Sequence, residues 1–282
     1  MSVHISRHVD DVLENLASRT DATILAGGTD LLVEINFGRQ RPTHIVAIDR
    51  VEELKDHSRN GHVRMGALVT YTRMLETDVG SPALVEAART IGSPQIRNAA
   101  TIGGNLGTCS PAGDTLPVLA ALEATVVLRS KKGERRVSFA DFMTGPKRSV
   151  RRPDELIVAA EWEDAGGAQT YMFAATRNAM AISISGLALV VDRARHRVGV
   201  GLGSCGPTII RATQAEGFAG GLFDEAGWEK PHRPSEAAAK EFGRLAAASA
   251  KPIDDVRGTA AYRRHVLAVM GARALARVAG IP

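Results

Sequence analysis

Two pairs of adjacent glycines, Gly27-Gly28 and Gly103-Gly104, most constrain how this 282-residue chain can fold. The first pair follows the apolar stretch Ala22–Leu25, which has the composition of a short strand, and it precedes a short helical pattern. The second pair follows a helical segment and two β-branched residues. Glycine adopts positive φ readily and lets a ligand reach backbone N–H groups that a Cβ atom would shield. Both pairs are therefore predicted to form turns that a ligand approaches closely.

The first turn joins a strand to a short helix, which Thr29 or Asp30 could cap. Exposed N–H groups at a helix N-terminus suit phosphate. The stretch has neither the GxGxxG pattern of dinucleotide-binding folds nor the lysine-containing pattern of a P-loop, so a Rossmann NAD site or a P-loop is not supported. Taken alone, it fits a plain strand-to-helix turn as well as it fits a ligand site.

Polar side chains cluster around the second turn within fourteen residues: Thr101, Asn105, Thr108, Ser110 and Asp114. Pyrophosphate prefers backbone N–H donors. Ribose or ribityl hydroxyls need a carboxylate acceptor, which Asp114 could supply. The alternative is an irregular loop in which Asp114 caps the next helix. Considered together, the two turns predict a dinucleotide that lies extended between two lobes.

The remaining patterns predict a fold of the α+β class. Residues 8–19 have apolar residues at helical spacing, and residues 43–51 contain a buried strand, so we expect a first lobe with a parallel pair of strands. Strands, a helical stretch interrupted near Gly80 and a hairpin turn at residues 131–134 follow. Glycine-rich residues 163–169 mark a boundary. Beyond it we expect two strands about a turn at residues 193–196 and then two helices, over residues 234–249 and 260–279.

Composition excludes several function classes. A hydrophobic fraction of 44% without a membrane-length apolar run, and an N-terminus without a signal-peptide pattern, lead us to expect a cytoplasmic protein without a membrane span. Two cysteines cannot ligate an iron–sulfur cluster alone, and the eight His residues show no metal-binding spacing. The basic cluster "KRSVRRPDE" has no aromatic platform, so we expect a solvated loop or a surface facing a partner or an anionic cofactor, and no nucleic acid.

Four stretches in family order, "ILAGGTDLLVEI", "IGSPQIRNAATIGGNLGTCSPAGDTLPVLAALEATVVLRS", "TRNAMAISISGLAL" with "VGLGSCGPTIIRA", and "DDVRGTAAYRR", span nearly the whole chain. They resemble the FAD-binding (medium) subunit of molybdenum hydroxylases, the family of xanthine dehydrogenase and aerobic carbon monoxide dehydrogenase. The resemblance implies a two-lobed α/β FAD-binding domain of the PCMH/vanillyl-alcohol-oxidase type over residues 1–165, with lobes of about 1–55 and 56–165. It also implies a smaller α+β domain of the carbon monoxide dehydrogenase flavoprotein type over residues 166–282.

By position, the resemblance implies that the first turn lines the FAD pyrophosphate and that the second holds the pyrophosphate and ribityl chain. Asp114 would accept from a sugar or ribityl hydroxyl, with Thr108 in the same loop, and Ile91 and Ile157 would contact the cofactor through packing or backbone. FAD is expected to be non-covalent, with no catalytic side chain and no metal on this chain. The complete set of expected cofactor-binding residues is Leu25, Ala26, Gly27, Gly28, Thr29, Asp30, Leu31, Ile91, Thr101, Ile102, Gly103, Gly104, Asn105, Thr108, Asp114 and Ile157.

The resemblance also implies a role in electron transfer. The substrate, which could be a purine, an aldehyde, an N-heterocycle or carbon monoxide, would be oxidised at a molybdenum cofactor on a large partner subunit. Electrons would pass through [2Fe-2S] clusters on a small subunit to FAD here and then to NAD+ or another acceptor, in a heterotrimer or a dimer of heterotrimers. Two alternatives are a structural or assembly subunit with degraded FAD binding and a stand-alone flavin oxidoreductase. Intact glycines at both turns oppose the first, and the short C-terminal domain opposes the second.

One position departs from the family pattern. Phe173 stands four residues before Arg177, where many relatives have a Lys close to the flavin. Loss of a cation near the ring would make the flavin harder to reduce unless another cation replaces it. Cys109 is expected to pack in the interior and not to act in redox chemistry. His44, His57 and His62 are expected at strand ends or on the surface.

Overall fold

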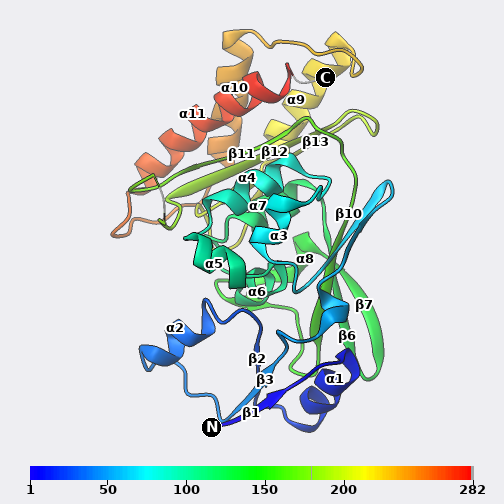
Figure 1. The fold of residues 1–282 in the computed structure, drawn as a ribbon. Coiled ribbons are helices and arrows are strands. Elements are labelled where there is room, and N and C mark those ends of the chain that lie inside the picture. Colours follow the sequence, from blue (N-terminus) through cyan, green and yellow to red (C-terminus); the bar gives the residue numbers. More distant parts are fainter. Residues whose placement is uncertain (179, 281–282) are drawn as a thin grey trace.

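The computed structural model describes residues 1–178 and 180–280, and its first lobe is a small three-stranded parallel sheet (Figure 1). Strands β1 (Ser2–Ile5) and β2 (Ala22–Leu25) both pair with β3 (His44–Ala47), in the order β1-β3-β2. Helix α1 (Val9–Ser18) buries the apolar side that its spacing predicted, and α2 (Leu31–Asn36) is the predicted short helix after the glycines. The expected parallel pair is confirmed as β2 and β3, while β1 was not predicted.

The second lobe is built on a five-stranded antiparallel sheet in the order β4-β5-β10-β6-β7. The strands are β4 (His57–Arg59), β5 (His62–Gly66), β6 (Thr125–Ser130), β7 (Gly133–Ser138) and β10 (Leu156–Glu163). The helices are α3 (Tyr71–Glu76), α4 (Pro82–Thr90), α5 (Pro94–Ala99), α6 (Ile102–Thr108), α7 (Thr115–Ala121) and α8 (Phe139–Phe142). A 3-10 turn, η1 (Glu52–Leu54), precedes the sheet, and a small ribbon of β8 (Met143–Gly145) and β9 (Arg148–Ser149) lies at its end.

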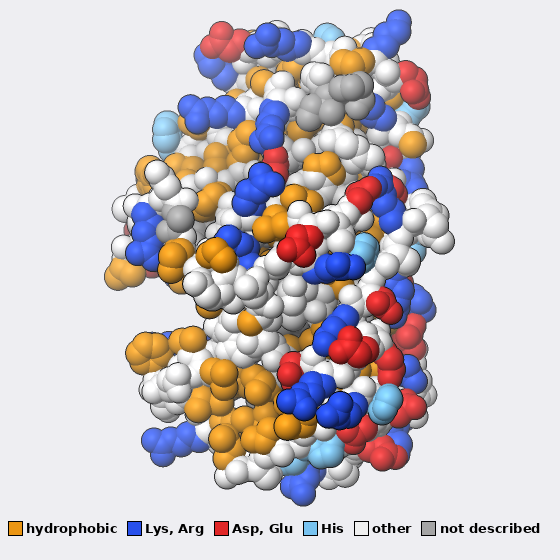
Figure 2. Space-filling model, in the orientation of Figure 1, with side chains coloured by type: hydrophobic (Ala, Val, Ile, Leu, Met, Phe, Trp, Pro, Cys, Tyr) orange, Lys and Arg blue, Asp and Glu red, His pale blue; other side chains and the backbone are white. Residues whose placement is uncertain are grey.

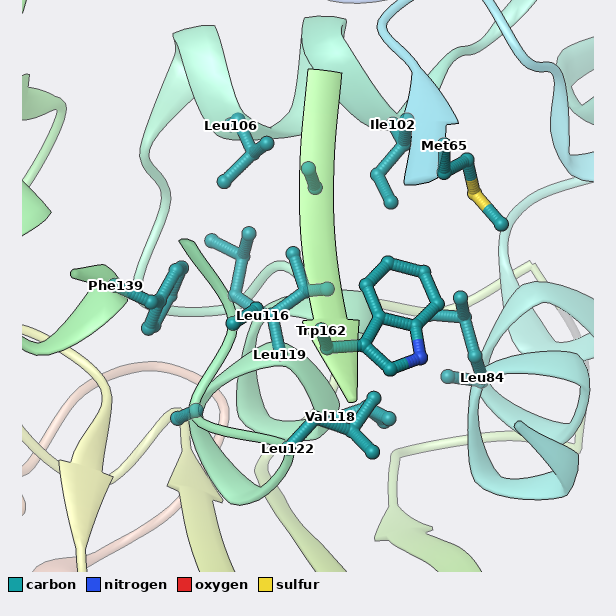
Figure 3. Close-up of a cluster of buried hydrophobic side chains, with 14 of the residues drawn as sticks. Met65, Leu84, Ile102, Leu106, Leu116, Val118, Leu119, Leu122, Phe139 and Trp162 are labelled. Carbon is teal, nitrogen blue, oxygen red and sulfur yellow. The ribbon is translucent and has the colours of Figure 1, made fainter. Parts of the chain in front are cut away.

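The core of this lobe surrounds Trp162 on β10, which is 2% exposed. Figure 3 shows Ile102 and Leu106 of α6 on one side of the indole and residues of α7 on the other. The break near Gly80 is real, because α3 ends before it and Ser81 caps α4 by accepting from the Leu84 N–H group. This core fixes α6 and α7, which carry the second glycine pair and Asp114.

The C-terminal part is a four-stranded antiparallel sheet between two layers of helices (Figure 1). Its strands are β11 (Gln169–Ala174), β12 (Ser185–Asp192), β13 (Arg197–Gly203) and β14 (Ile210–Arg211). Helices α9 (Thr213–Ala226), α10 (Glu236–Ser249) and α11 (Ala260–Val278) cover one face, and α4 and α7 of the second lobe cover the other. The expected strands β12 and β13 and the last two helices are present, whereas α9 was not predicted.

Backbone contacts press this sheet against α7. A Cβ atom added to Gly201 would lie 1.9 Å from the Pro117 carbonyl oxygen, and one added to Gly199 would lie 2.0 Å from that of Ala121. Only glycine allows so close an approach between a strand and a helix. The link between β10 and β11, residues 164–168, falls within the stretch 163–169 at which the sequence suggests a boundary. The two parts are therefore separate in the chain but tightly packed in space.

Candidate functional site

A cavity of about 640 Å³ lies between the two N-terminal lobes. Figure 2 shows the hollow at mid-height, with hydrophobic side chains gathered on the lower lobe beside it. Nearly all the residues that the sequence predicted as cofactor-binding line it, from both lobes: Leu25, Ala26, Gly27, Gly28, Thr29, Asp30, Leu31, Ile91, Thr101, Gly103, Gly104, Asn105, Thr108, Asp114 and Ile157. The structure thus brings three distant segments of the chain to one site.

Ile102 is the exception. Its side chain is fully buried in the core and points toward Met65 and Trp162 (Figure 3), and it is absent from the cavity wall. Its N–H group donates to the Val69 carbonyl oxygen at 3.2 Å. The helix therefore turns the Ile102 side chain away from the cavity, and its contact with a ligand stays a prediction.

The first glycine pair leaves backbone donors available. Gly28 has φ of +73°, and the N–H groups of Gly28, Thr29 and Asp30 have no acceptor among the residues that the structure describes. Asp30 is at the N-cap of α2 but makes no capping bond; it accepts instead from Thr108 Oγ1 at 3.3 Å, across the gap between the lobes. This turn can therefore receive an anion.

Gly27 lines the cavity and is also a contact point between the two lobes. A Cβ atom there would lie 1.7 Å from the Ala99 carbonyl oxygen, at the end of α5. Gly27 therefore sets how near the lobes can come at the base of the cavity.

The second glycine pair is not a loop turn but the first turn of α6. Thr101 caps the helix, because its Oγ1 accepts from the Gly104 N–H group at 3.0 Å. Gly103 N–H donates to the Ala67 carbonyl oxygen at 2.8 Å, and Asn105 N–H donates to that of Thr101 at 3.0 Å. These donors already have protein acceptors. A ligand contact by this segment stays a prediction, and it would have to use groups other than these three N–H donors.

The second glycine pair, Gly103-Gly104, leaves room for close packing and for the cavity, and it does not supply free backbone donors. A Cβ atom on Gly103 would lie 2.6 Å from the Ala67 carbonyl oxygen, so this glycine serves packing. A Cβ atom on Gly104 would meet only Thr101 Oγ1, at 3.1 Å, and otherwise extend toward the cavity. The amide of Asn105 accepts from Thr115 Oγ1 at 2.7 Å, which leaves its NH₂ group without a partner among the described residues. Asn105 can therefore donate to a ligand.

Asp114 is buried in the wall of the cavity, 9% exposed. Tyr171 Oη, from β11, donates to its Oδ1 at 2.7 Å. Burial raises the pKa of Asp114 to about 6, and the hydrogen bond from Tyr171 acts in the opposite direction. Its side chain makes no capping bond to α7, so the alternative of a plain N-cap is not what the structure shows.

Two cations at the cavity were not singled out from the sequence. Lys147 and Arg151, both within the basic cluster, line it. Lys147 Nζ donates to Glu34 Oε1 on α2 at 3.0 Å, and Arg151 Nη1 donates to the carbonyl oxygens of Arg152 and Glu155 at 3.1 and 2.7 Å. The dense run of basic residues was the signal that could have found them. The sequence left open whether this basic cluster is a solvated loop or faces a partner or an anionic cofactor, and the position of these two residues at the cavity fits an anionic cofactor.

The Phe173 ring does not contribute to the cavity wall; it stacks on Tyr171 with ring centroids 6.3 Å apart. Cys109 and Cys205 are both buried, and burial raises the pKa of each thiol, that of Cys109 to about 11. Cys109 is therefore a packed interior group, as expected. The expectation for the three histidines is confirmed: His44, His57 and His62 each begin a strand.

Comparison with known proteins agrees with this geometry. Residues 1–161 match the family of the FAD binding domain in molybdopterin dehydrogenase, and residues 169–278 match the CO dehydrogenase flavoprotein C-terminal domain. The FAD-subunit of nicotinate dehydrogenase from Eubacterium barkeri is 39% identical over 184 residues, which are 61% of this chain and 62% of that relative. A putative xanthine dehydrogenase FAD-binding subunit of Escherichia coli K12 is 33% identical over 228 residues, covering 76% of this chain and 77% of its own length.

Solved structures show the same architecture. Carbon monoxide dehydrogenase from Hydrogenophaga pseudoflava superposes with a TM-score of 0.87 at 25% identity, over 99% of this chain and 98% of that one. Two lobes about a cavity, followed by an antiparallel sheet with helices, define the class of flavoprotein subunits of molybdenum-containing dehydrogenases. The chain belongs to this family, its cofactor is FAD, and it is an oxidoreductase component. Within the described residues, no helix is long and apolar enough to cross a membrane.

Proposed function

We propose that FAD lies, non-covalently, in the cavity between the lobes, with its pyrophosphate at the first glycine turn. The free N–H groups of Gly28, Thr29 and Asp30 support this, because anions favour clustered backbone donors. Lys147 and Arg151 supply positive charge at the same cavity. Asn105 and Asp114 offer a donor and an acceptor for ribityl or ribose hydroxyls. The residues present therefore fit a long, anionic and hydroxyl-bearing cofactor.

The single observation that carries this proposal is that donors, cations and a buried carboxylate converge on one cavity from both lobes. When bound, FAD supplies the ability to accept electrons singly and to release them as a pair. The chain's own residues hold, orient and shield it. We infer that electrons come from [2Fe-2S] clusters of a partner, since two buried cysteines cannot supply four thiolates. NAD+ is the proposed acceptor, with oxygen or a quinone as other possibilities.

We also propose two partners: a large subunit with the molybdenum cofactor and a small subunit with the clusters, in a heterotrimer or a dimer of heterotrimers. Several relatives are named as medium chains or subunits of complexes. Their names include nicotinate, xanthine and carbon monoxide dehydrogenases, so we propose a substrate of this range: a purine, an aldehyde, an N-heterocycle or carbon monoxide. Its binding site would lie on the large subunit.

An apolar surface beside the cavity supports a partner there. Met180, Ile182, Ile253 and Val256 are exposed, and Ile182 also lines the cavity. Arg263 holds the two segments together, because its guanidinium donates to the Ile184 carbonyl oxygen and to Asp255 Oδ1. We propose that the small subunit covers this surface.

The first experiment is to purify the chain, desalt it, and identify any flavin released on denaturation. Stoichiometric FAD is expected. A folded chain that stays empty after incubation with FAD would contradict the binding proposal and favour the assembly subunit.

Val256→Asp tests the partner surface in the co-expressed complex: the small subunit should be lost while FAD content is retained. Retention of the small subunit by Val256→Asp would contradict this location. The control is Lys230→Asp, because Lys230 lies on an exposed loop and not in the core, whereas Val85, for example, packs on the core.

A further inference from the structure

Asp114, in the wall of the cavity, accepts a hydrogen bond from the C-terminal part of the chain and not only from the two lobes that form the cavity. Its hydrogen-bond donor, Tyr171, belongs to β11 of the C-terminal sheet, 57 residues further along the chain. Both side chains are buried, with Tyr171 5% exposed. The bond from a phenol to a carboxylate oxygen at 2.7 Å is therefore a fixed link between the C-terminal sheet and the cavity wall.

Several contacts hold Tyr171 in place. Its N–H group donates to Glu86 Oε2 on α4 at 2.7 Å, and Thr170 Oγ1 donates to the same oxygen at 2.8 Å. Arg277 of α11 donates to Glu86 Oε1 at 2.5 Å and to Thr170 Oγ1 at 3.0 Å. The last helix of the chain thus braces the strand that carries Tyr171.

Neighbouring residues also confine the phenol ring of Tyr171. A Cβ atom on Gly186, on the neighbouring strand β12, would lie 2.7 Å from Tyr171 Oη. Phe173 stacks on the ring from the same strand. The hydroxyl therefore has one position, and that position is the one that reaches Asp114.

We propose that Tyr171 is a positioning residue of the cofactor site: by fixing the Asp114 carboxylate, it lets the C-terminal domain set the affinity and the pH range of FAD binding. This inference rests on the proposed role of Asp114 as acceptor for a cofactor hydroxyl. A donor to one oxygen orients the carboxylate and favours its ionised form, and an ionised acceptor binds a hydroxyl more strongly than a neutral one. Tyr171 itself need not touch FAD.

The groups that face Asp114 come from several elements. Besides Tyr171 of β11, the nearby hydroxyl groups of Ser183, before β12, and of Thr90, at the end of α4, lower its pKa. Burial raises the pKa of Tyr71 of α3, and the nearby charge of Asp114 raises it further. No cation contributes to the pKa of Asp114. Removal of the Tyr171 hydroxyl should therefore leave the carboxyl with a pKa above about 6, so that it becomes neutral at a higher pH.

The test is FAD titration into the full-length apoprotein, read by quenching of flavin fluorescence, across a pH range on both sides of about 6. Tyr171→Phe should raise the dissociation constant about tenfold at alkaline pH and move the loss of affinity to higher pH. Gly186→Ala keeps the hydroxyl but displaces it, and should give the same direction of change. Tyr262→Phe, on the exposed surface of α11, is the matched control and should change neither quantity.

A double-mutant cycle separates this inference from the proposed function. Asp114→Asn alone should weaken FAD binding, and in that background Tyr171→Phe should have little further effect. If Asp114→Asn weakens binding but Tyr171→Phe leaves the affinity and its pH dependence unchanged, or if the two effects add, the inference fails while the cofactor role of Asp114 stands. If Asp114→Asn binds FAD like the natural chain, the role of Asp114 fails and the inference with it. Circular dichroism of each variant verifies that it is folded.

Discussion

Lys147 of the second lobe forms an ion pair with Glu34 of the first, with 3.0 Å between Nζ and Oε1, and Lys147 lines the cofactor cavity. The hydrogen bond and charge of Lys147 hold the pKa of Glu34 below its usual range, so Glu34 is ionised. Lys147 and, at 3.7 Å, Arg39 offset the charge of this carboxylate. The ion pair therefore balances an acidic charge next to a residue that lines the cavity.

Lys147→Gln should weaken FAD binding about threefold at low ionic strength, since a positive charge at the cavity is lost and Glu34 keeps only its longer contact with Arg39. Added salt should reduce the difference. The double variant Lys147→Gln with Glu34→Gln should recover part of the loss. Equilibrium titration at two salt concentrations measures both. Lys131→Gln is the control, because Lys131 pairs with Glu14 away from the cavity. Equal effects of the two Lys changes would mean that only net charge matters.

Gly104→Val should abolish FAD retention while leaving the chain folded. An added Cβ atom meets only Thr101 Oγ1, and Gly104 lines the cavity, so the rest of the valine side chain would take up cavity space. Flavin content after desalting and the circular dichroism spectrum check this prediction. The same change at Gly217 of α9, where nothing lies within 4 Å of the added Cβ, should leave flavin content unaltered. A Gly104→Val protein with full flavin content would remove this segment from the site.

Gly201→Ala should lower the free energy of unfolding by about 3 kcal/mol, the upper end of the cost of overpacking. The methyl group would lie 1.9 Å from the Pro117 carbonyl oxygen, and backbone on both sides cannot move aside without shifting α7. Gly217→Ala should instead stabilise the chain by about 0.5–1 kcal/mol, because alanine favours the helix. Urea unfolding of the two variants measures both changes. If Gly201→Ala left the free energy of unfolding unchanged, β13 and α7 would not be in such close contact.

Asp114 should make the apoprotein less stable as pH rises from about 4 to about 6. Burial raises its pKa from 3.8 to about 6, so in this window the folded state binds more protons than the unfolded state. The pKa difference between the folded and unfolded states lowers the free energy of unfolding by about 3 kcal/mol, and this loss is complete above about pH 6. Asp114→Asn should therefore stabilise the apoprotein at neutral pH, by an amount that shrinks as pH falls toward 4. A stability difference that does not vary with pH would contradict the buried, ionisable carboxyl.

Much of the fold followed from local patterns. The parallel pair β2 and β3, helix α1 and the hairpin of β6 and β7 have strong periodicity or turn residues, and each is present. Helix α9 was not predicted because its three glycines and mixed composition hide its period. It forms because Ala215, Ala219 and Phe223 pack on the C-terminal sheet, a tertiary contact that local sequence does not encode.

Most residues that line the cavity could be predicted from the sequence, but the contacts that each of them makes could not. The glycine pairs marked segments that line the cavity, yet close contacts with the Ala99 and Ala67 backbones also require glycine at Gly27 and Gly103. Such contacts join residues far apart in the chain, so no local pattern reports them. Tyr171 was missed for the same reason: its link to Asp114 exists only once the C-terminal sheet has packed on α7.

The Gly27 contact with Ala99 has a consequence for anyone redesigning this scaffold. Because the two surfaces that meet there are both main chain, no choice of side chain at Ala99 can widen the gap, and any side chain at Gly27 would force it apart. The base of the binding site thus has a width set by the polypeptide itself. Changing which nucleotide-like molecule this protein accepts would have to work through the walls, at positions such as Lys147, Asn105 and Ile157, or through the length of the segments that carry them.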